Sequence, residues 1–520
     1  MIDSAFLLDD AQMQQFIVDG YITVRADYPP EFHDRIYQEI ETVFEHEGNI
    51  GNNILPRIPQ LQKVFDYPAV RGALTSLLGE GYIMNPHRHC HLNPPGGKGQ
   101  HWHKDCYVFD HNIRHPRFHW VMAFYYPQDT TEDMGPTAIL PRKQAYKTVS
   151  HTDPQHASEQ ALPLCGEAGT VMLVHFDSWH RATPNRSTRK RYMLKFQFAR
   201  MQHPQAPSWN HENRVWQPVA NDANPAVSMD VWNWLCGSTS LPGTDVEISQ
   251  PAQNGELAHL KAALRDGDEK VRGEAAAALG AMGMVAKDAA PNLVEALHDE
   301  SETVRLNAAY ALGNIGESVV PVLIDAMCEE TLTAIAETTA KTPDNAHGTN
   351  PTAGYAAQAL SVVGSPAVPA LVSVLDHAHW WIRAMAVDVL MKIGPPAKAA
   401  VRALMERFND EHWWVRRNAI EALGVIVPSS PDAIPLLIEG LGDADYRVRR
   451  NAAITLAKFG QCAEKAIPAL VSALDDEDRY NRFYAASALR PIGTPTAQDA
   501  LVDALFAARW CPITTRDNRY

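Results

Sequence analysis

Two histidines, an aspartate and an arginine in the first half of the chain have the types and spacing of a metal-dependent oxidation site. His103 and Asp105 are two positions apart in GQHWHKD, so on an extended strand both side chains point to the same side. His180 follows in the segment SWHRATPNRSTRKR. Two imidazoles and one carboxylate form the facial triad that holds non-haem Fe(II) and leaves coordination positions open. We therefore expect these three residues to bind iron and to form the catalytic centre.

The open positions of such a triad suit a chelating co-substrate and dioxygen. 2-Oxoglutarate would take two of them and O2 the third. Arg191 follows His180 in the strand-like segment RYMLKFQF, where it shares one face with Lys195. An arginine can pair through two N–H groups with the distal carboxylate of 2-oxoglutarate. We therefore expect Arg191 to bind this co-substrate.

Other histidines offer competing arrangements. His175 and Asp177 repeat the His-x-Asp pattern shortly before His180, but neither has a partner at the expected distance upstream. A second metal site is also open, because histidines alternate further upstream; the alternative is ordinary cavity-lining or surface histidines. Pro94 and Pro95 interrupt that stretch, which argues against one continuous array. The alternating residues are His87, His89, His91, His101 and His103.

Short strands are the elements that must position these residues. The segments FHWVMAFYY and RYMLKFQF alternate in polarity, and GTVMLVHF is a continuous apolar run typical of a buried strand. Many short strands joined by Pro- and Gly-rich connections favour a sandwich or jelly roll. Two helices are expected before them, in DDAQMQQF and PPEFHDRIYQEIETVFEH. We assign this domain to residues 1–240.

The second half of the chain repeats every 33 residues. Val/Ile-Arg pairs mark the period, and small residues keep the same phase. Each unit is predicted to be a helix, a polar turn and an Ala-rich helix, and such units must stack to bury their apolar faces. The pattern resembles HEAT repeats. We expect about seven units over 255–510, with an insertion around 331–354, a linker at 241–254 and a tail at 511–520.

Composition limits the classes of protein that remain. The 520 residues are 45% hydrophobic and 21% charged, which is ordinary for a globular protein. A formal charge of −15 disfavours nucleic acid and anionic membranes as partners. There is no apolar run of membrane-spanning length and no signal-like N-terminus, and the seven cysteines form no C-x-x-C pair. We expect a cytoplasmic protein.

The first 235 residues resemble the phytanoyl-CoA dioxygenase family of Fe(II)/2-oxoglutarate oxygenases. The resemblance implies a double-stranded β-helix, which is a jelly-roll or cupin-like fold. It assigns the iron to His103, Asp105 and His180, and the co-substrate to Arg191. The matching motifs are WHKD, MGPTAILP at 134–141, the strand that begins at Gly169, and the set His180, Asn185, Ser187 and Arg191.

The chain departs from the family pattern in three places. Ala182 stands where many members have a serine that contacts 2-oxoglutarate, so this contact is lost or passes to Thr183. Asn93 stands where some members use a basic residue for the co-substrate. Arg142 and Lys143 follow the MGPTAILP motif, near the expected cavity mouth. They either bind an anionic substrate, such as a carboxylate, phosphate or CoA group, or are solvated loop charges.

Asp105 favours hydroxylation, because related halogenases replace this carboxylate with a small residue. The resemblance then implies hydroxylation of an unactivated C–H bond of a small molecule, coupled to decarboxylation of 2-oxoglutarate to succinate and CO2. Two alternatives remain. One is an interaction scaffold whose oxygenase domain is residual. The other is an oxygenase that acts on a protein recruited by the solenoid.

Aromatic and basic pairs recur at the turns of the solenoid. Packing between neighbouring turns would explain them, with the repeated arginines bonded to acidic turn residues such as Asp410, Asp443 and Asp476. A surface for a protein partner, for self-association or for the oxygenase domain is the alternative. The iron-binding HEAT-like repeats of deoxyhypusine hydroxylase need His-Glu pairs, which are missing here. The recurring pairs are Trp380-Trp381, Trp413-Trp414, Tyr446-Arg447 and Arg479-Tyr480.

Overall fold

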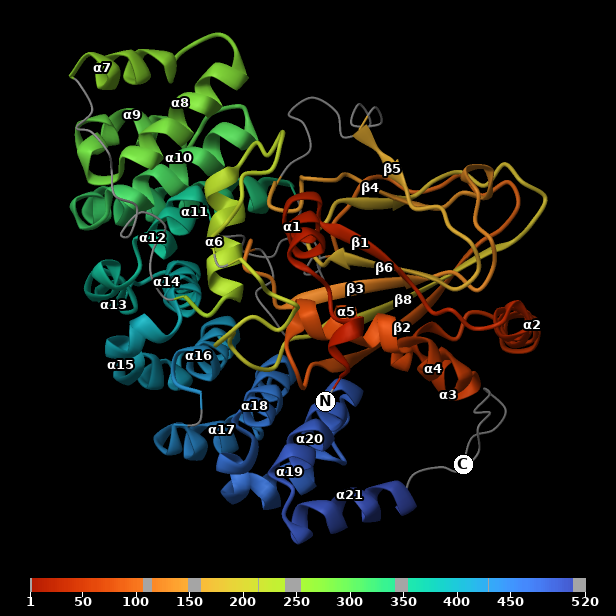
Figure 1. Ribbon diagram of the computed structural model, residues 1–520. Coiled ribbons are helices and arrows are strands. Elements are labelled where there is room, and N and C mark those ends of the chain that lie inside the picture. Colours follow the sequence, from red (N-terminus) through yellow and green to blue (C-terminus); the bar gives the residue numbers. More distant parts are fainter. Residues whose placement is uncertain are drawn as a thin grey trace.

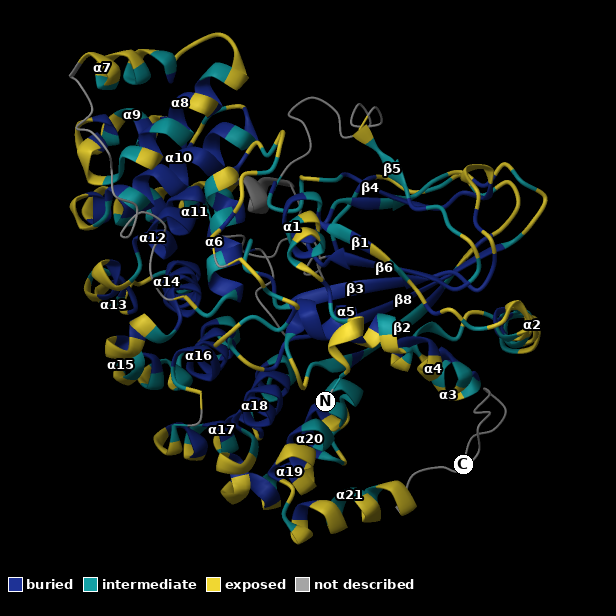
Figure 2. Ribbon diagram, viewed as in Figure 1, coloured by how far each residue is buried: buried dark blue, intermediate teal, exposed yellow. Residues whose placement is uncertain are grey.

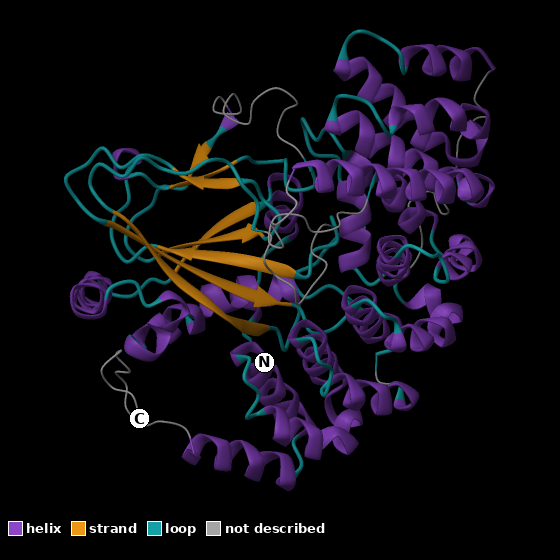
Figure 3. Ribbon diagram, turned by 180° about the vertical axis from the view of Figure 1, so that it is seen from behind, coloured by secondary structure: helices purple, strands orange, loops and turns teal. Residues whose placement is uncertain are grey.

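The computed structural model describes residues 2–105, 115–147, 160–213, 215–238, 254–341, 354–428 and 430–507. A β-rich part extends to residue 238 and an all-helical part begins at residue 254 (Figure 1). The helical part curves along one side of the β-rich part, as the view from behind also shows (Figure 3). The predicted tail and all but the last residue of the predicted linker lie outside the described residues, as do residues 342–353 of the predicted insertion.

Five antiparallel strands form the main sheet, in the order β1 (Tyr21–Arg25), β6 (Thr170–His175), β3 (Trp120–Tyr125), β8 (Arg191–Ala199) and β2 (Ile83–Asn93). The central strands β3, β6 and β8 are buried along their whole length. Successive side chains of β3 point to opposite faces. Trp120 and Met122 face the interior of the roll, whereas Val121 and Ala123 face the covering helices.

A smaller sheet closes the jelly roll over the main sheet, in the order β5 (Leu162–Pro163), β4 (Thr137–Ile139) and β7 (His180–Ala182). Ile139 of β4 packs in one apolar cluster with Trp120 and Met193 of the main sheet. β7 begins at His180, so the closing strand of the roll itself carries a predicted metal ligand. The predicted jelly roll is confirmed.

Helices cover the outer face of the main sheet (Figure 2). Phe65, for example, stacks on Phe196 of β8 with ring centroids 4.5 Å apart. This apolar layer fixes the strands from outside and leaves the inner face for the site. The helices are α1 (Asp10–Asp19), α2 (Pro30–Glu47), α3 (Ile54–Arg57), α4 (Gln60–Asp66), α5 (Pro68–Leu78) and α6 (Pro225–Leu235).

Longer and shorter helices alternate in most of the second part, with α11 to α13 as the exception, and they confirm the predicted HEAT-repeat solenoid. The longer helices stack side by side through small and aliphatic residues such as Ala386, Ala419 and Ala452, which are fully buried. The helices are α7 (Asn254–Ala263), α8 (Glu269–Met282), α9 (Ala290–Ala296), α10 (Glu302–Ile315), α11 (Val320–Lys341), α12 (Tyr355–Val363), α13 (Val368–Val374), α14 (Trp380–Ile393), α15 (Val401–Glu406), α16 (Trp413–Ile426), α17 (Ile434–Gly440), α18 (Tyr446–Phe459), α19 (Ile467–Ala473), α20 (Arg479–Ile492) and α21 (Pro495–Ala507).

A ladder of ion pairs links successive repeats. Arg383 donates from Nε to Asp410 Oδ2 at 2.7 Å, and Arg416 and Asp443 repeat the contact at 2.8 Å. Each guanidinium also bonds the second carboxylate oxygen, which gives a bidentate pair. The predicted bonds between the repeated arginines and acidic turn residues are confirmed at these positions and for the pair of Arg449 with Asp476.

The aromatic and basic pairs of the turns stack on one another. The rings of Trp380 and His412 lie 3.6 Å apart and nearly parallel. The guanidinium of Arg447 lies 3.4 Å from the ring centre of Trp413, which is a close cation–π contact. The predicted packing between neighbouring turns is therefore present in this part of the solenoid.

The solenoid and the jelly roll share a buried polar interface beside α6. Arg117 donates from Nη2 to Asp230 Oδ1 at 2.6 Å, and Tyr310 of α10 donates to Asp230 Oδ2 at 3.1 Å. Asn224 donates to Asn307 at 2.9 Å.

No single helix in the described ranges is long and apolar enough to cross a membrane. Helix α12 and the segment Ser365–Val374 reach that length and composition only together, with a bend of 111° between them.

Candidate active site

His103 and His180 face each other across an antiparallel bridge. The backbone N–H of His103 donates to the carbonyl of His180 at 3.1 Å, and the reverse bond measures 3.0 Å. Their ring centroids are 4.4 Å apart. His180 is held from its other side by pairing with Ile139 of β4. The two imidazoles are thus brought together by the backbone of the smaller sheet.

Hydrogen bonds at Nδ1 orient both rings. His103 Nδ1 lies 2.9 Å from the carbonyl of His101, and His180 Nδ1 lies 3.0 Å from that of Ser178. Because a carbonyl only accepts, each Nδ1 carries the proton and donates it, which leaves Nε2 with a lone pair. Burial lowers the pKa of His180 to about 4. The ring is therefore neutral near pH 7, as a metal ligand must be.

Asp105 completes a group of three ligand atoms. One atom from each of His103, Asp105 and His180 lies within 4.8 Å of the others, and Asp105 Oδ1 is 3.7 Å from His180 Nε2. Two imidazole nitrogens and a carboxylate oxygen are the donors of a facial iron site, so the donor set fits this metal. In the part of the chain that the structure describes, no other such group of His, Cys, Asp or Glu occurs, and His87, His89 and His91 form none.

Lys195 is a buried cation at the same site. Its Nζ donates to Asp105 Oδ2 at 2.7 Å. Burial by itself would raise the pKa of Asp105, but the Lys195 ammonium and the two imidazoles more than offset it and hold this pKa below its usual range. The strand period indicated that Lys195 shares a face with Arg191. Its contact with Asp105 was not predicted, because it depends on where two distant segments meet.

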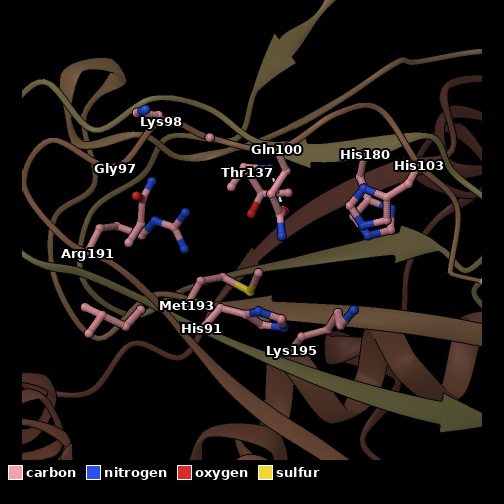
Figure 4. A pocket seen from close by; sticks show the side chains of 14 residues that line it. His91, Gly97, Lys98, Gln100, His103, Thr137, His180, Arg191, Met193 and Lys195 are labelled. Atoms are coloured by element: carbon pink, nitrogen blue, oxygen red, sulfur yellow. Dashed lines mark hydrogen bonds between the residues drawn. The ribbon is translucent and has the colours of Figure 1, made fainter. Parts of the chain in front are cut away.

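A cavity of about 270 Å³ connects the histidines with Arg191. Arg191 lies at one end and His103 and His180 at the other (Figure 4). Arg191 donates from Nε and Nη2 to the carbonyl of Gly135, at 3.0 and 2.7 Å, which fixes the guanidinium in the wall. The wall consists of His91, Leu92, Asn93, Gly97, Lys98, Gly99, Gln100, His103, Thr137, His180, Ala182, Arg191, Met193 and Lys195.

Asn93 lies at the Arg191 end of the cavity, whereas Thr183 does not line it. Asn93 Nδ2 donates to the carbonyls of Gly135 and Thr183, at 2.9 and 3.0 Å. The Thr183 hydroxyl donates to the carbonyl of Pro136 at 2.7 Å, so it stabilises the turn beside β7. A role of either side chain in co-substrate binding stays a prediction.

Arg142 and Lys143 do not line the cavity. The backbone at Arg142 has a positive φ of 66°, and its side chain donates to Asp19 Oδ1 at 2.8 Å. Lys143 lies over the ring of Tyr146, 5.2 Å from its centre. Both cations are directed toward neighbouring parts of the chain, and their predicted substrate role gains no support from their position.

His175 and Asp177 belong to the structural core. The His175 ring packs against Phe118, with centroids 5.5 Å apart, and its Nδ1 accepts from the backbone N–H of Asp177 at 3.1 Å. Asp177 forms a buried ion pair with Lys104 at 3.1 Å. The side chains of this second His-x-Asp motif therefore form structural contacts and do not belong to the His103, Asp105 and His180 group.

A jelly roll with this His-Asp-His group and a buried arginine defines the class of Fe/2-oxoglutarate-dependent dioxygenases. Residues 17–193 match the family described as phytanoyl-CoA dioxygenase. Its second part matches HEAT repeats at 257–340, 347–424, 401–490 and 434–509. The family and the repeats predicted from the sequence are thus confirmed.

The similar proteins described here each cover less than half of this chain. A probable alpha-ketoglutarate-dependent hypophosphite dioxygenase of Stutzerimonas stutzeri is 22% identical over 227 aligned positions, and the match covers 35% of this chain and 76% of that protein. SnoK, a non-haem alpha-ketoglutarate-dependent carbocyclase from nogalamycin biosynthesis, is 16% identical, with a TM-score of 0.32 over 39% of this chain and 87% of its own. HygX from Streptomyces hygroscopicus, solved with nickel and 2-oxoglutarate, is 10% identical, with a TM-score of 0.32 over 37% and 88%.

Proposed function

We propose that the protein is an Fe(II)/2-oxoglutarate-dependent oxygenase that hydroxylates an unactivated C–H bond of a small molecule. 2-Oxoglutarate would be decarboxylated to succinate and CO2 in the same turnover. The observation that carries the proposal is the cavity with His103 and His180 at one end and Arg191 at the other, together with the grouping of Asp105 with the two histidines. The match of residues 17–193 to the phytanoyl-CoA dioxygenase family supports the same class of reaction.

The residues of the cavity have separate tasks in this proposal. His103, Asp105 and His180 hold the metal, and their Nδ1 bonds and the Lys195 contact keep them in place. When bound, iron supplies the activation of O2 that C–H hydroxylation requires. Arg191 receives the distal carboxylate of 2-oxoglutarate, because its guanidinium is already fixed in the wall by Gly135.

Asp105 supports hydroxylation rather than halogenation. Its carboxylate fills the ligand position that halogenases of this kind leave open for a halide. Asp105 Oδ1 lies near His180 Nε2, so one oxygen is available to the metal. The same geometry argues against a residual site, because all three ligand side chains are present and face one point.

Binding of the co-substrate to the metal-loaded protein tests the proposal. Purified protein is mixed anaerobically with Fe(II) and then with 2-oxoglutarate, and the weak visible charge-transfer band of the chelate is followed. We expect the band in wild type, its loss in His103→Ala and a weaker band at equal co-substrate in Arg191→Ala. Arg142→Ala is the matched control, because this arginine lies outside the cavity wall. A folded, metal-loaded wild type without the band would refute the proposal.

Whether the solenoid binds a partner is a separate part of the proposal. A protein partner or self-association through the HEAT repeats stays a prediction, as does the cytoplasmic location. The solenoid side that meets α6 is already covered by the jelly roll through Arg117, Asp230 and Tyr310. We therefore place any partner on another side of the solenoid.

A further inference from the structure

The two oxygens of Asp105 face different partners. Oδ2 accepts a hydrogen bond from Lys195 Nζ at 2.7 Å, whereas Oδ1 points to the histidines and lies 3.7 Å from His180 Nε2. The side chains of Lys195 and Asp105 are only 5% and 3% exposed. Charge-assisted hydrogen bonds between buried partners are strong and directional, so this contact restricts rotation of the carboxylate.

Lys195 is itself held in place by the centre of the sheet. It lies on β8, between Phe124 of β3 and His89 of β2, with which it is in register. Arg191 is four residues earlier on the same strand and therefore on the same face. The arginine of the cavity and the lysine beside the metal ligands are thus carried by one rigid element.

The number of oxygens that Asp105 offers decides what else can bind the metal. A carboxylate can coordinate through one oxygen or two. If both oxygens bound, Asp105 would take a coordination position that 2-oxoglutarate or O2 needs. With Oδ2 bonded to Lys195, only Oδ1 remains for the metal. The carboxylate then occupies one position and leaves the others open.

We propose that Lys195 is a positioning residue that makes Asp105 a one-oxygen metal ligand and thereby keeps the position for the co-substrate open. The inference rests on the proposed metal site at His103, Asp105 and His180. It differs from a purely electrostatic role. A nearby ammonium repels a metal cation, so its removal would by charge alone tighten metal binding and leave the coordination unchanged.

Cobalt(II) is a suitable probe, because its visible bands report the number and arrangement of ligands without turnover. Lys195→Met removes the ammonium and keeps an unbranched side chain of similar length. We expect altered Co(II) bands and an affinity of the Co(II)-loaded protein for 2-oxoglutarate that falls about tenfold. Lys195→Gln retains a donor toward Oδ2 and is expected to restore most of the wild-type spectrum.

Lys190→Met is the matched control, at the residue that directly precedes β8. Lys190 pairs with Glu41 at 2.9 Å outside the cavity, so its loss should leave the bands and the affinity unchanged. Wild-type bands and wild-type affinity in a folded Lys195→Met protein would overturn the inference. If Lys195→Met does not fold, fully altered Co(II) bands in a folded Lys195→Gln protein would overturn the inference instead. Absence of Co(II) bands in wild type would refute the metal site itself, which is a different outcome.

Discussion

Gly135 joins the co-substrate end of the cavity to the surrounding backbone. Its carbonyl accepts both bonds of Arg191 and one from Asn93. Its φ is +69°, and a Cβ would lie 2.4 Å from Asn93 Nδ2 and 2.6 Å from the carbonyl of Thr183. A side chain here would meet a strained backbone and two close neighbours at once, so the position requires glycine.

Gly135→Ala should therefore weaken co-substrate binding while metal binding persists. The added methyl group must displace Asn93 or the Thr183 carbonyl, or shift the Gly135 backbone that holds Arg191, whereas His103 and His180 lie at the other end of the cavity. We expect an affinity for 2-oxoglutarate lowered by about tenfold or more, corresponding to the 1–3 kcal/mol of a strained backbone position. Titration of the Co(II)-loaded protein with 2-oxoglutarate measures it.

Gly48→Ala separates backbone strain from the local clash. Gly48 also has a positive φ, of 72°, but no atom lies within 4 Å of its Cβ position. It should cost stability without changing the affinity for 2-oxoglutarate. Equal affinities of the Gly135→Ala and wild-type proteins would contradict the role given to Gly135.

The sequence predicted the residues of the site better than their connections. The sequence argument for His103 and Asp105 was the two-residue period of a strand, but the structure has only an isolated bridge at His103 in this segment. Arg191 does lie on a strand, as predicted, at the start of β8. The bond between Lys195 and Asp105 spans 90 residues and depends on strand register, which no local pattern contains. The position of Arg142 outside the cavity wall depends on a similar long-range contact, because its side chain pairs with Asp19, far away in the sequence.

At the scale of elements, α20 of the solenoid docks on β2, the strand that carries His91 and Asn93. Asn85 donates to the Tyr484 hydroxyl at 2.6 Å, and both side chains are buried. The Tyr480 hydroxyl lies 3.5 Å from His87 Nδ1. The aromatic and basic pairs of the turns were predicted either to pack on one another or to form a docking surface. They do both, because Tyr480, in the last pair of the series, contacts the oxygenase domain.

Tyr484→Phe should loosen this contact. It leaves the Asn85 amide buried without its hydroxyl acceptor, and such a group costs about 1–3 kcal/mol. We expect the free energy of unfolding to fall by this amount in denaturant titrations. Tyr446→Phe is the control, because Tyr446 is only partly buried and packs through its ring, so a change below about 0.5 kcal/mol is expected. Equal losses in the two variants would argue against a specific α20–β2 contact.

At the scale of the whole molecule, the repeats and the jelly roll were predicted separately, but their docking was not. The 33-residue period requires stacking within the solenoid and is visible in sequence. Asp230 accepts hydrogen bonds from Arg117 and from Tyr310. These bonds join three distant segments only once, so no repeat in the sequence predicts them. The buried ion pair and hydrogen bonds nevertheless join the two parts and argue against a freely detached recruitment arm.

A cluster of histidines and cations lies at this interface, and we expect it to lose stability in acid. His203 lines a small cavity between the two parts, together with His115, Arg117 and Lys392. Burial, followed by the positive charges of Arg117 and Arg200, lowers the pKa of His203 to about 4. An imidazole held neutral in the folded protein is a group whose stabilising effect is lost in acid.

The sign and size of the effect follow from the two pKa values of His203. Above its ordinary pKa of 6.5, the ring is neutral in both states and the stability is fully present. As the pH falls from 6.5 toward 4, the unfolded chain binds a proton that the folded protein does not. Between pH 7 and pH 5 we expect His203 to account for a loss of about 2 kcal/mol in the free energy of unfolding.

The His203→Gln protein should lose that much less stability over this interval, as measured by denaturant unfolding at the two pH values. His259→Gln, at an exposed position on α7, should behave as wild type. The same pH dependence in His203→Gln and wild type would show that His203 is not the group responsible.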